Sequence, residues 1–313
     1  MIEKPDVDAL MAGELGQWLE TQVSVREEAR LKTKRRFIWL AVGVAGLFAV
    51  LTIAPVSDQL RLFLTFAPAM FGAVWAWHPR GEAIKATKTG INEAIARALG
   101  IEYAHDCDPS VSFVRARDHK MFGSYSRSSF EDLWHGDLGG LPFSLHEAHL
   151  QRKEGSGKNS RWVTVFRGPI ITIAGARPFH GVTLLDRSGR HRKMLWFGEK
   201  ETLELDGVEL ARADMVHPDF EDAFTVYTND QVEARWLVHP TYIEKLIALE
   251  DAFNGRDVRA LFKDGELTIV LSSGNMFESG SIDATRDRAN VERCIDQFMA
   301  MAELAASLNE APR

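Results

Sequence analysis

The sequence contains few of the residues that define several common classes of protein. Only two of its 313 residues are cysteines, Cys107 and Cys294, too few for a disulfide framework and typical of a reducing compartment. Basic residues are also outnumbered, because 37 Lys and Arg stand against 44 Asp and Glu, which gives a formal net charge of −7. A general nucleic-acid binder needs a basic face, so we expect no nucleic-acid partner.

Apolar residues are concentrated near the N-terminus. Residues 37–54 form a run of 18 residues without a charge, and a helix of that length is about 27 Å long, close to the roughly 30 Å thickness of bilayer hydrocarbon. Residues 62–77 form a second uncharged stretch, which contains Pro68, and only residues 55–61 separate the two. We therefore predict a two-helix transmembrane hairpin over residues 37–78. Burial in a soluble core is the alternative for the first segment, and an interfacial or re-entrant segment for the second.

Basic and aromatic residues flank both apolar segments. We predict that the membrane-interface anchors are Arg35, Arg36, Trp39, Trp75, Trp77 and Arg80. Bases cluster before the first segment and after the second, whereas the connecting loop contains Arg61 alone. Because positive charge stays on the cytoplasmic side, we expect a multi-pass protein in contact with the lipid bilayer, with both termini in the cytoplasm.

Two cytoplasmic regions are expected outside the hairpin. Helical spacing of apolar residues predicts an amphipathic helix within residues 1–36. Residues 79–313 first continue as a helix that ends at Gly100, and then change to short β-branched and aromatic segments. Strands are expected over residues 162–166, 170–173, 182–185, 194–197, 203–205, 224–227, 261–262 and 267–271. With amphipathic helices over residues 241–253 and 291–308, this pattern predicts an α+β fold with a mainly antiparallel sheet and flanking helices.

Three segments resemble catalytic or metal-binding motifs, and each departs from the required pattern. The glycine-rich loop at residues 154–158 has Arg152 where a phosphate-binding loop needs glycine, and Asn159 where it needs serine or threonine. The two histidines of residues 146–149 are three positions apart rather than the four of a zinc-protease helix. Residues 105–108, His-Asp-Cys-Asp, lack a second ligand cluster and are better explained as a turn. We predict no catalytic, cofactor-binding or metal-binding residues.

One longer motif resembles a known family. Residues 220–235 read Phe-Glu-Asp-Ala-Phe-Thr-Val-Tyr-Thr-Asn-Asp-Gln-Val-Glu-Ala-Arg, which is similar to the central motif of the bacterial domain-of-unknown-function 3137 family. Residues 130–140, 166–168 and 267–277 are similar to further landmarks of that family, so the resemblance covers roughly residues 80–285. It implies a protein anchored in the bacterial inner membrane, often by two helices ahead of the domain, and it implies no known activity.

The same motif also has a structural interpretation. Alternating apolar residues over 220–226 predict a half-buried strand, and Asp230 is placed to cap a short helix on which Glu233 and Arg235 are exposed or paired. The motif is therefore either a strand-to-helix junction or a surface that binds a partner or ligand through Asp230, Glu233 and Arg235.

These observations lead to two functional hypotheses. The first is a non-catalytic, membrane-anchored protein that binds a protein partner, acts as a scaffold or forms a homo-oligomer. The alternative is a membrane-bound, hydrolase-like enzyme whose site is assembled from residues distant in sequence. A deep pocket with convergent acids or histidines would favour the enzyme. A soluble binding module requires that the apolar segments are buried.

Overall fold

A computed structural model of the chain describes residues 3–175, 177–191, 200–214, 223–274 and 276–307. The chain divides into two units. One consists of residues 6–94 and 278–292, and the other of residues 1–5, 95–277 and 293–313. We refer to them as the helical unit and the sheet unit.

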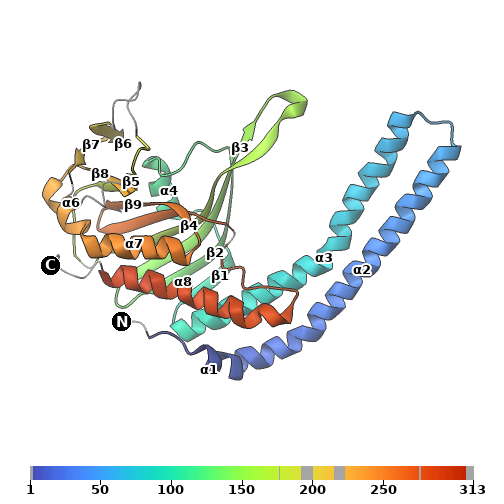
Figure 1. The fold of residues 1–313 in the computed structure, drawn as a ribbon, viewed down its shortest axis with the longest axis horizontal. Helices are drawn as coiled ribbons and strands as arrows, with labels where there is room; N and C mark the ends of the chain where they lie inside the picture. The colour runs from blue at the N-terminus through green and yellow to red at the C-terminus, as the bar shows by residue number, and fades with distance from the viewer. Residues whose placement is uncertain (1–2, 176, 192–199, 215–222, 275, 308–313) are drawn as a thin grey trace. The chain divides into compact units, whose positions relative to one another are not determined.

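Three helices make up most of the helical unit: α1 (Val7–Ala12), α2 (Glu14–Ile53) and α3 (Asp58–Leu99), whose last turn belongs to the sheet unit. The helix expected within residues 1–36 is observed as α1 and the first half of α2, which runs unbroken into the apolar segment. α2 and α3 form an antiparallel hairpin (Figure 1). Contact between them is close, because a Cβ atom added at Gly72 would lie 2.2 Å from the Leu40 side chain.

Residues 278–292 close the helical unit by packing on the end of this hairpin. They contain the 3₁₀ turn η2 (Ala284–Arg286) and the start of α8 (Asp287–Ser307). Arg26 of α2 donates two hydrogen bonds of 2.7 Å to the Asp287 carboxylate, and both side chains are almost fully buried. Ser279 donates a 2.6 Å hydrogen bond to the Asn92 side chain of α3. Buried polar contacts therefore fix this segment in place.

The sheet unit contains a ten-stranded antiparallel sheet, which confirms the predicted α+β class. Its strands are β1 (Glu102–Asp106), β2 (Arg127–Asp137), β3 (Pro142–Glu154), β4 (Arg161–Ala174), β5 (Thr183–Arg187), β6 (Thr202–Leu205), β7 (Val208–Ala213), β8 (Phe224–Thr228), β9 (Arg256–Lys263) and β10 (Glu266–Ser272). Their order across the sheet is β1-β2-β3-β4-β10-β9-β5-β8-β7-β6. Because β10 and β9 enter between β4 and β5, chain segments distant in sequence meet in the middle of the sheet.

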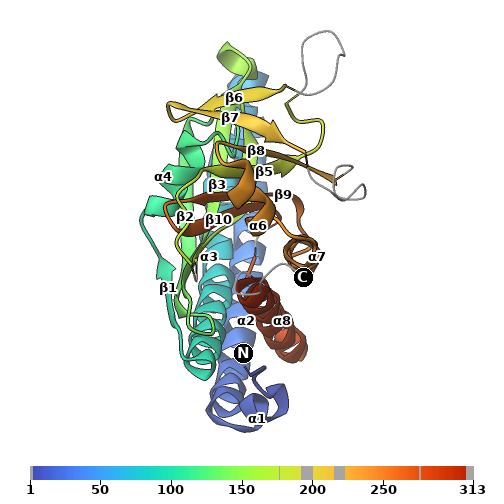
Figure 2. The ribbon, with the colours of Figure 1, turned by 90° about the vertical axis from the view of Figure 1, so that its left-hand side faces the viewer.

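Helices cover both faces of this sheet. α4 (Val111–Asp118) packs on one face, where Phe113 makes an edge-to-face contact with Phe130 of β2, with ring centroids 4.7 Å apart. On the other face lie α7 (Pro240–Ala252) and residues 293–307 of α8 (Figure 2). There Tyr242 packs against Phe262, and Phe298 against Trp134. The short helix α6 (Gln231–Leu237) follows β8. Burial on both faces explains the apolar runs in the central strands.

The local predictions had mixed outcomes. The expected turn between residues 261–262 and 267–271 is the β9–β10 hairpin, whose loop residues Asp264 and Gly265 both have positive φ, 54° and 74°. The prediction of two separate strands at residues 162–166 and 170–173 was wrong, because β4 is continuous through Gly168. A side chain at Gly168 would lie 2.1 Å from the Leu271 carbonyl oxygen, so only glycine permits this approach of β10. The strand expected at 194–197 lies outside the described residues.

Candidate functional site

The residues predicted as a partner surface lie at the junction between β8 and α6. Asp230 caps α6 as predicted, accepting hydrogen bonds from the backbone N–H groups of Val232 and Glu233 at 3.0 and 2.9 Å. The Glu233 carboxylate accepts from the backbone N–H groups of His180 and Gly181 at 3.0 and 2.7 Å. These two carboxylates therefore organise the chain locally.

The other described parts of this motif differ in burial. Arg235 is exposed on α6. β8 is buried along its whole length rather than half-buried, because it lies between β5 and β7 in the sheet interior. Residues 220–222 lie outside the described part of the chain. The role of Asp230, Glu233 and Arg235 as a partner surface stays a prediction.

The predicted membrane-interface anchors gather at one level of the α2–α3 hairpin. The Arg36 guanidinium lies 4.4 Å from the Trp75 ring centroid and also donates a 2.9 Å hydrogen bond to the Trp75 carbonyl oxygen. Arg80 lies 5.1 Å from the Trp77 ring. Trp39 is 63% exposed. Arginine paired with tryptophan is typical of residues at a lipid–water interface.

A polar cluster on β1 and β2 was not found by sequence reasoning. The Asp132 carboxylate is fully buried and accepts a 2.6 Å hydrogen bond from the Tyr103 hydroxyl, and its Oδ1 lies 3.1 Å from His105 Nδ1. Asp132 has a φ of 57° at a bulge between β2 and β3. A bulge of this kind redirects side chains, and here Glu131 also offers an oxygen, so that its ligand atom and those of His105 and Asp132 lie within 4.8 Å of one another.

This cluster changes the interpretation of residues 105–108. His105 and Asp106 belong to β1 rather than to a turn, and the second group of ligands comes from the neighbouring strand. Histidine with two carboxylates can hold a divalent metal, but the hydrogen bond from Tyr103 also accounts for the position of Asp132. Burial raises the pKa of the nearby Cys107 thiol to about 11, and the negative charge of Asp132 adds to the effect. Cys107 therefore remains a neutral thiol at physiological pH rather than a nucleophilic thiolate.

The two histidines that resemble a zinc-protease motif lie on β3 and not on a helix. Side chains three positions apart on a strand point to opposite faces of the sheet, so His146 and His149 cannot bind one ion. His146 is fully buried, with Ser110 Oγ 3.3 Å from its Nε2. Burial lowers the pKa of His146 to about 4.

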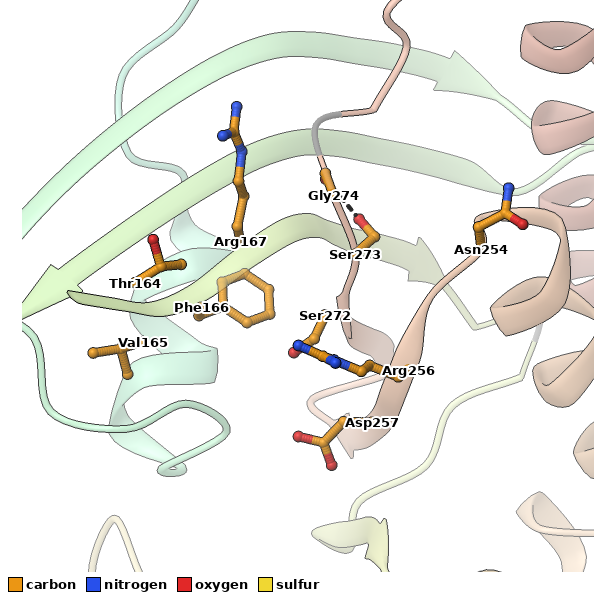
Figure 3. Close-up of a pocket in the computed structure, with 10 residues that line it drawn as sticks. All are labelled: Thr164, Val165, Phe166, Arg167, Asn254, Arg256, Asp257, Ser272, Ser273 and Gly274. Atoms are coloured by element: carbon orange, nitrogen blue, oxygen red, sulfur yellow. Dashed lines mark hydrogen bonds between the residues drawn. The ribbon is translucent and has the colours of Figure 1, made fainter.

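A cavity of about 510 Å³ opens where β10 leaves β4. Its lining comes from β4, from the start of β9 and the turn before it, and from the end of β10 and the two residues after it: Thr164, Val165, Phe166, Arg167, Asn254, Arg256, Asp257, Ser272, Ser273 and Gly274. Figure 3 shows the Arg256 side chain extending toward Ser272 among the residues that line the cavity. Among these described lining residues Asp257 is the one acid, and there is no histidine. The cavity therefore lacks the convergent acids and histidines expected of a hydrolase site.

The Asp257 carboxylate in this cavity is already engaged by two arginines. Arg259 donates a 2.6 Å hydrogen bond to its Oδ2, and Arg190 approaches the same oxygen at 3.2 Å. Arg259 also lies beside the buried Asp186, with Nε 3.4 Å from Oδ1. Because Asp257 is neutralised in this way, the cavity presents the positive charge of Arg256 to solvent.

The fold and these sites define an α+β protein with an N-terminal hairpin of two helices long and apolar enough to span a membrane. Residues 164–310 match the family described as "Protein of unknown function (DUF3137)", which confirms the resemblance seen in the sequence. The matched region starts later and ends nearer the C-terminus than the predicted 80–285. No curated protein matches the sequence. Among solved structures, the crystal structure of the mycobacterial trehalose monomycolate transport factor A, TtfA, is similar, with 10% sequence identity and a TM-score of 0.32 over 69% of this chain and 95% of that chain.

Proposed function

We propose that the protein is a non-catalytic, membrane-anchored partner-binding protein of the bacterial inner membrane. The α2–α3 hairpin inserts into the bilayer as a two-pass anchor, and the α+β domain over residues 79–313 binds a protein partner in the cytoplasm. The observation that carries this proposal is the exposed apolar surface of the hairpin.

That surface is difficult to explain in water. In the most apolar windows of α2 and α3, only 6% and 11% of the residues are buried by the rest of the chain. Large side chains such as Phe66, Phe71 and Val74 are each more than two-thirds exposed. An apolar surface of this extent marks a lipid or protein contact, and a helix that is apolar on all sides is typical of a membrane span.

Partner binding is supported by the character of the polar sites. The cavity at β4 and β10 is lined by two arginines, one acid and several hydroxyl and amide side chains. The buried His146 and the neutral thiol of Cys107 are poorly suited to acid–base or nucleophilic catalysis. These polar sites therefore suit the binding of a polypeptide better than the hydrolysis of a substrate.

An alkaline wash of membrane vesicles tests the anchor. We expect the intact protein to remain in the membrane pellet, because only disruption of the bilayer releases a transmembrane helix. In a variant with Val44→Lys and Phe48→Lys, each lysine near the centre of the helix costs about 2.5–3.5 kcal/mol of insertion free energy. We therefore expect this variant to be released into the supernatant or degraded.

The matched control places lysines on the same helix outside the apolar segment. Val23 and Leu31 are both exposed on α2, so the Val23→Lys, Leu31→Lys variant should stay in the pellet. Release of the unmodified protein by the alkaline wash would exclude the anchor.

A further inference from the structure

We propose that the outer part of β4, residues 161–166, is a docking edge for an extended, acidic segment of a protein partner, which joins the sheet there as an additional strand. This inference rests on the proposed partner-binding function and specifies the class of partner. We call these six residues the open edge.

The open edge exists because β4 is longer than one of its neighbours. β3 pairs with β4 from Arg161 to Ile173, whereas β10 pairs with it only from Ile170 to Ala174. The Ser273 N–H donates a last 2.8 Å hydrogen bond to the Arg167 carbonyl, and the chain then turns away. In the described part of the chain no strand pairs with residues 161–166 on this side. At 3.3 Å per residue the open edge offers about 20 Å of strand.

Backbone groups of the open edge point outward. The Gln151 carbonyl of β3 accepts a 2.9 Å hydrogen bond from the Ser126 N–H, so the peptide groups of Gln151 face β2. Gln151 is the partner of Thr164 in the register, next to a bulge at which Leu150 faces Phe166 and Val165 has no facing residue on β3. In an antiparallel pair the two facing residues either exchange hydrogen bonds or both point away from each other. The peptide groups of Thr164, and those of Trp162 two residues earlier, therefore face the unpaired side. Unpaired N–H and C=O groups of this kind are a template for an incoming strand.

The surroundings of the open edge select the chemistry of that strand. Thr164 of the open edge lines the 510 Å³ cavity together with Arg256 and Asp257. Arg256 is exposed, and the charge of Asp257 is neutralised by Arg190 and Arg259. Trp162 is 47% exposed and offers an apolar surface. In a segment that alternates carboxylate and β-branched residues, the two kinds of side chain lie on opposite faces of the sheet. Such a segment would direct its carboxylates toward Arg256 and pack its apolar side chains against the neighbouring side chains of β4.

Charge argues against a second copy of the same edge as the occupant. Residues 161–167 read Arg-Trp-Val-Thr-Val-Phe-Arg and contain no acid. Antiparallel pairing of two such edges in matching register would set Arg161 of one copy opposite Arg167 of the other, and like charges in facing positions destabilise a sheet. An acidic partner strand has no such conflict.

A peptide titration tests the proposal. The probe is a fluorescein-labelled nonapeptide, Thr-Val-Glu-Val-Glu-Val-Glu-Val-Thr, titrated with the full chain in detergent micelles and followed by anisotropy. We expect saturable binding that weakens at high salt, at least 10-fold weaker binding when lysine replaces each glutamate, and slower hydrogen exchange at the Trp162 and Thr164 amides. Two further peptides carry N-methyl groups, one at the odd-numbered and the other at the even-numbered residues. Alternate N–H groups of a strand point to opposite edges, so only the peptide whose methyl groups replace the donors that face β4 should lose binding.

Three variants locate the site. Thr164→Pro removes an outward donor that β3 does not use and should weaken binding at least 10-fold. Arg256→Glu should weaken binding of the acidic probe by a similar factor and improve binding of the lysine peptide. Arg293→Glu, a matched reversal at an exposed residue of α8, should leave both affinities unchanged. If Thr164→Pro disturbs folding, the N-methylated peptides still test the backbone contacts.

Several results would overturn the proposal. These are absence of binding, equal binding of the acidic and lysine peptides, unchanged affinity after Arg256→Glu, or loss of binding after Arg293→Glu, which would place the peptide on α8. A dimer of the unmodified chain that Thr164→Pro converts to monomer would instead identify a second copy as the occupant. Because the assay uses micelles, failure of the membrane anchor would not change these results.

Discussion

Burial at a single histidine links the stability of the sheet unit to pH. His146 is fully buried on β3, and this burial lowers its pKa from an ordinary value near 6.5 to about 4. In the unfolded chain the same group binds a proton below about pH 6.5. The folded state therefore keeps the full contribution of neutral His146 above pH 6.5 and loses it progressively as the pH falls toward 4.

The size of this effect can be measured with one substitution. A difference of about 2.5 pKa units corresponds to about 3 kcal/mol, so His146→Gln should reduce the loss of unfolding free energy between pH 6.5 and 4 by about that amount. Denaturant unfolding of the intact chain in micelles at several pH values provides the measurement. His180→Gln, at an exposed histidine, is the control. The same pH dependence in the unmodified chain and in His146→Gln would contradict the assignment.

Residues whose roles depend on local chain geometry could be predicted, and those that depend on strand pairing could not. Asp230 was predicted as a helix cap because a cap needs only its own following N–H groups. The association of His105 with Asp132 depends on the β1–β2 register, in which Ala104 faces Leu133 and Asp106 faces Glu131. Nothing in the spacing of the sequence specifies that register.

At the level of elements, the ion pair between α2 and α8 carries the clearest energetic consequence. Arg26 and Asp287 are 1% and 4% exposed. Removing one partner leaves an unpaired buried charge, which typically costs about 3–5 kcal/mol. We expect Arg26→Met to lower the unfolding free energy of the intact chain by that amount, and the double variant Arg26→Met, Asp287→Leu to recover most of the loss.

An exposed ion pair on the same helix provides the control for this prediction. Lys32 and Glu28 are joined at 2.7 Å near the surface, and an exposed pair contributes at most about 1 kcal/mol. Lys32→Met should therefore change the unfolding free energy only slightly. If the losses from Arg26→Met and Asp287→Leu simply added, the two side chains would not be energetically coupled.

Helix ends and hairpin turns could also be predicted from local sequence, whereas the order of the strands in the sheet could not. The β9–β10 hairpin and the α3 stop at Gly100 follow from turn residues, and Gly100 has the positive φ expected at a helix end. The strand order does not follow from such signals, because β10 pairs with β4 across about a hundred residues. The open edge of β4 is a consequence of that pairing, so it could not be found before the strand order was known.

For the whole molecule, the distribution of basic residues predicts how the hairpin crosses the membrane. Arg30, Lys32, Lys34, Arg35 and Arg36 precede the apolar part of α2, and Arg80, Lys85 and Lys88 follow that of α3. Between the two apolar segments, residues 55–61 contain Arg61 as their one basic residue, and it is paired with Asp58 at 2.8 Å. Because short loops rich in Lys and Arg remain in the cytoplasm, the loop should face the opposite side of the membrane from both termini.

Reporter fusions test this orientation directly. Alkaline phosphatase, which is active only outside the cytoplasm, should be active when fused after Asp58 and inactive when fused at Arg313, and a fluorescent protein that folds only inside should show the reverse. A variant with Gln at the five bases before the apolar part of α2 and Lys added between residues 55 and 60 reverses the charge asymmetry, so it should weaken or invert this pattern. Alkaline phosphatase activity at both positions in the unmodified chain would mean that α3 does not cross the bilayer, because Asp58 and Arg313 would then lie on the same side.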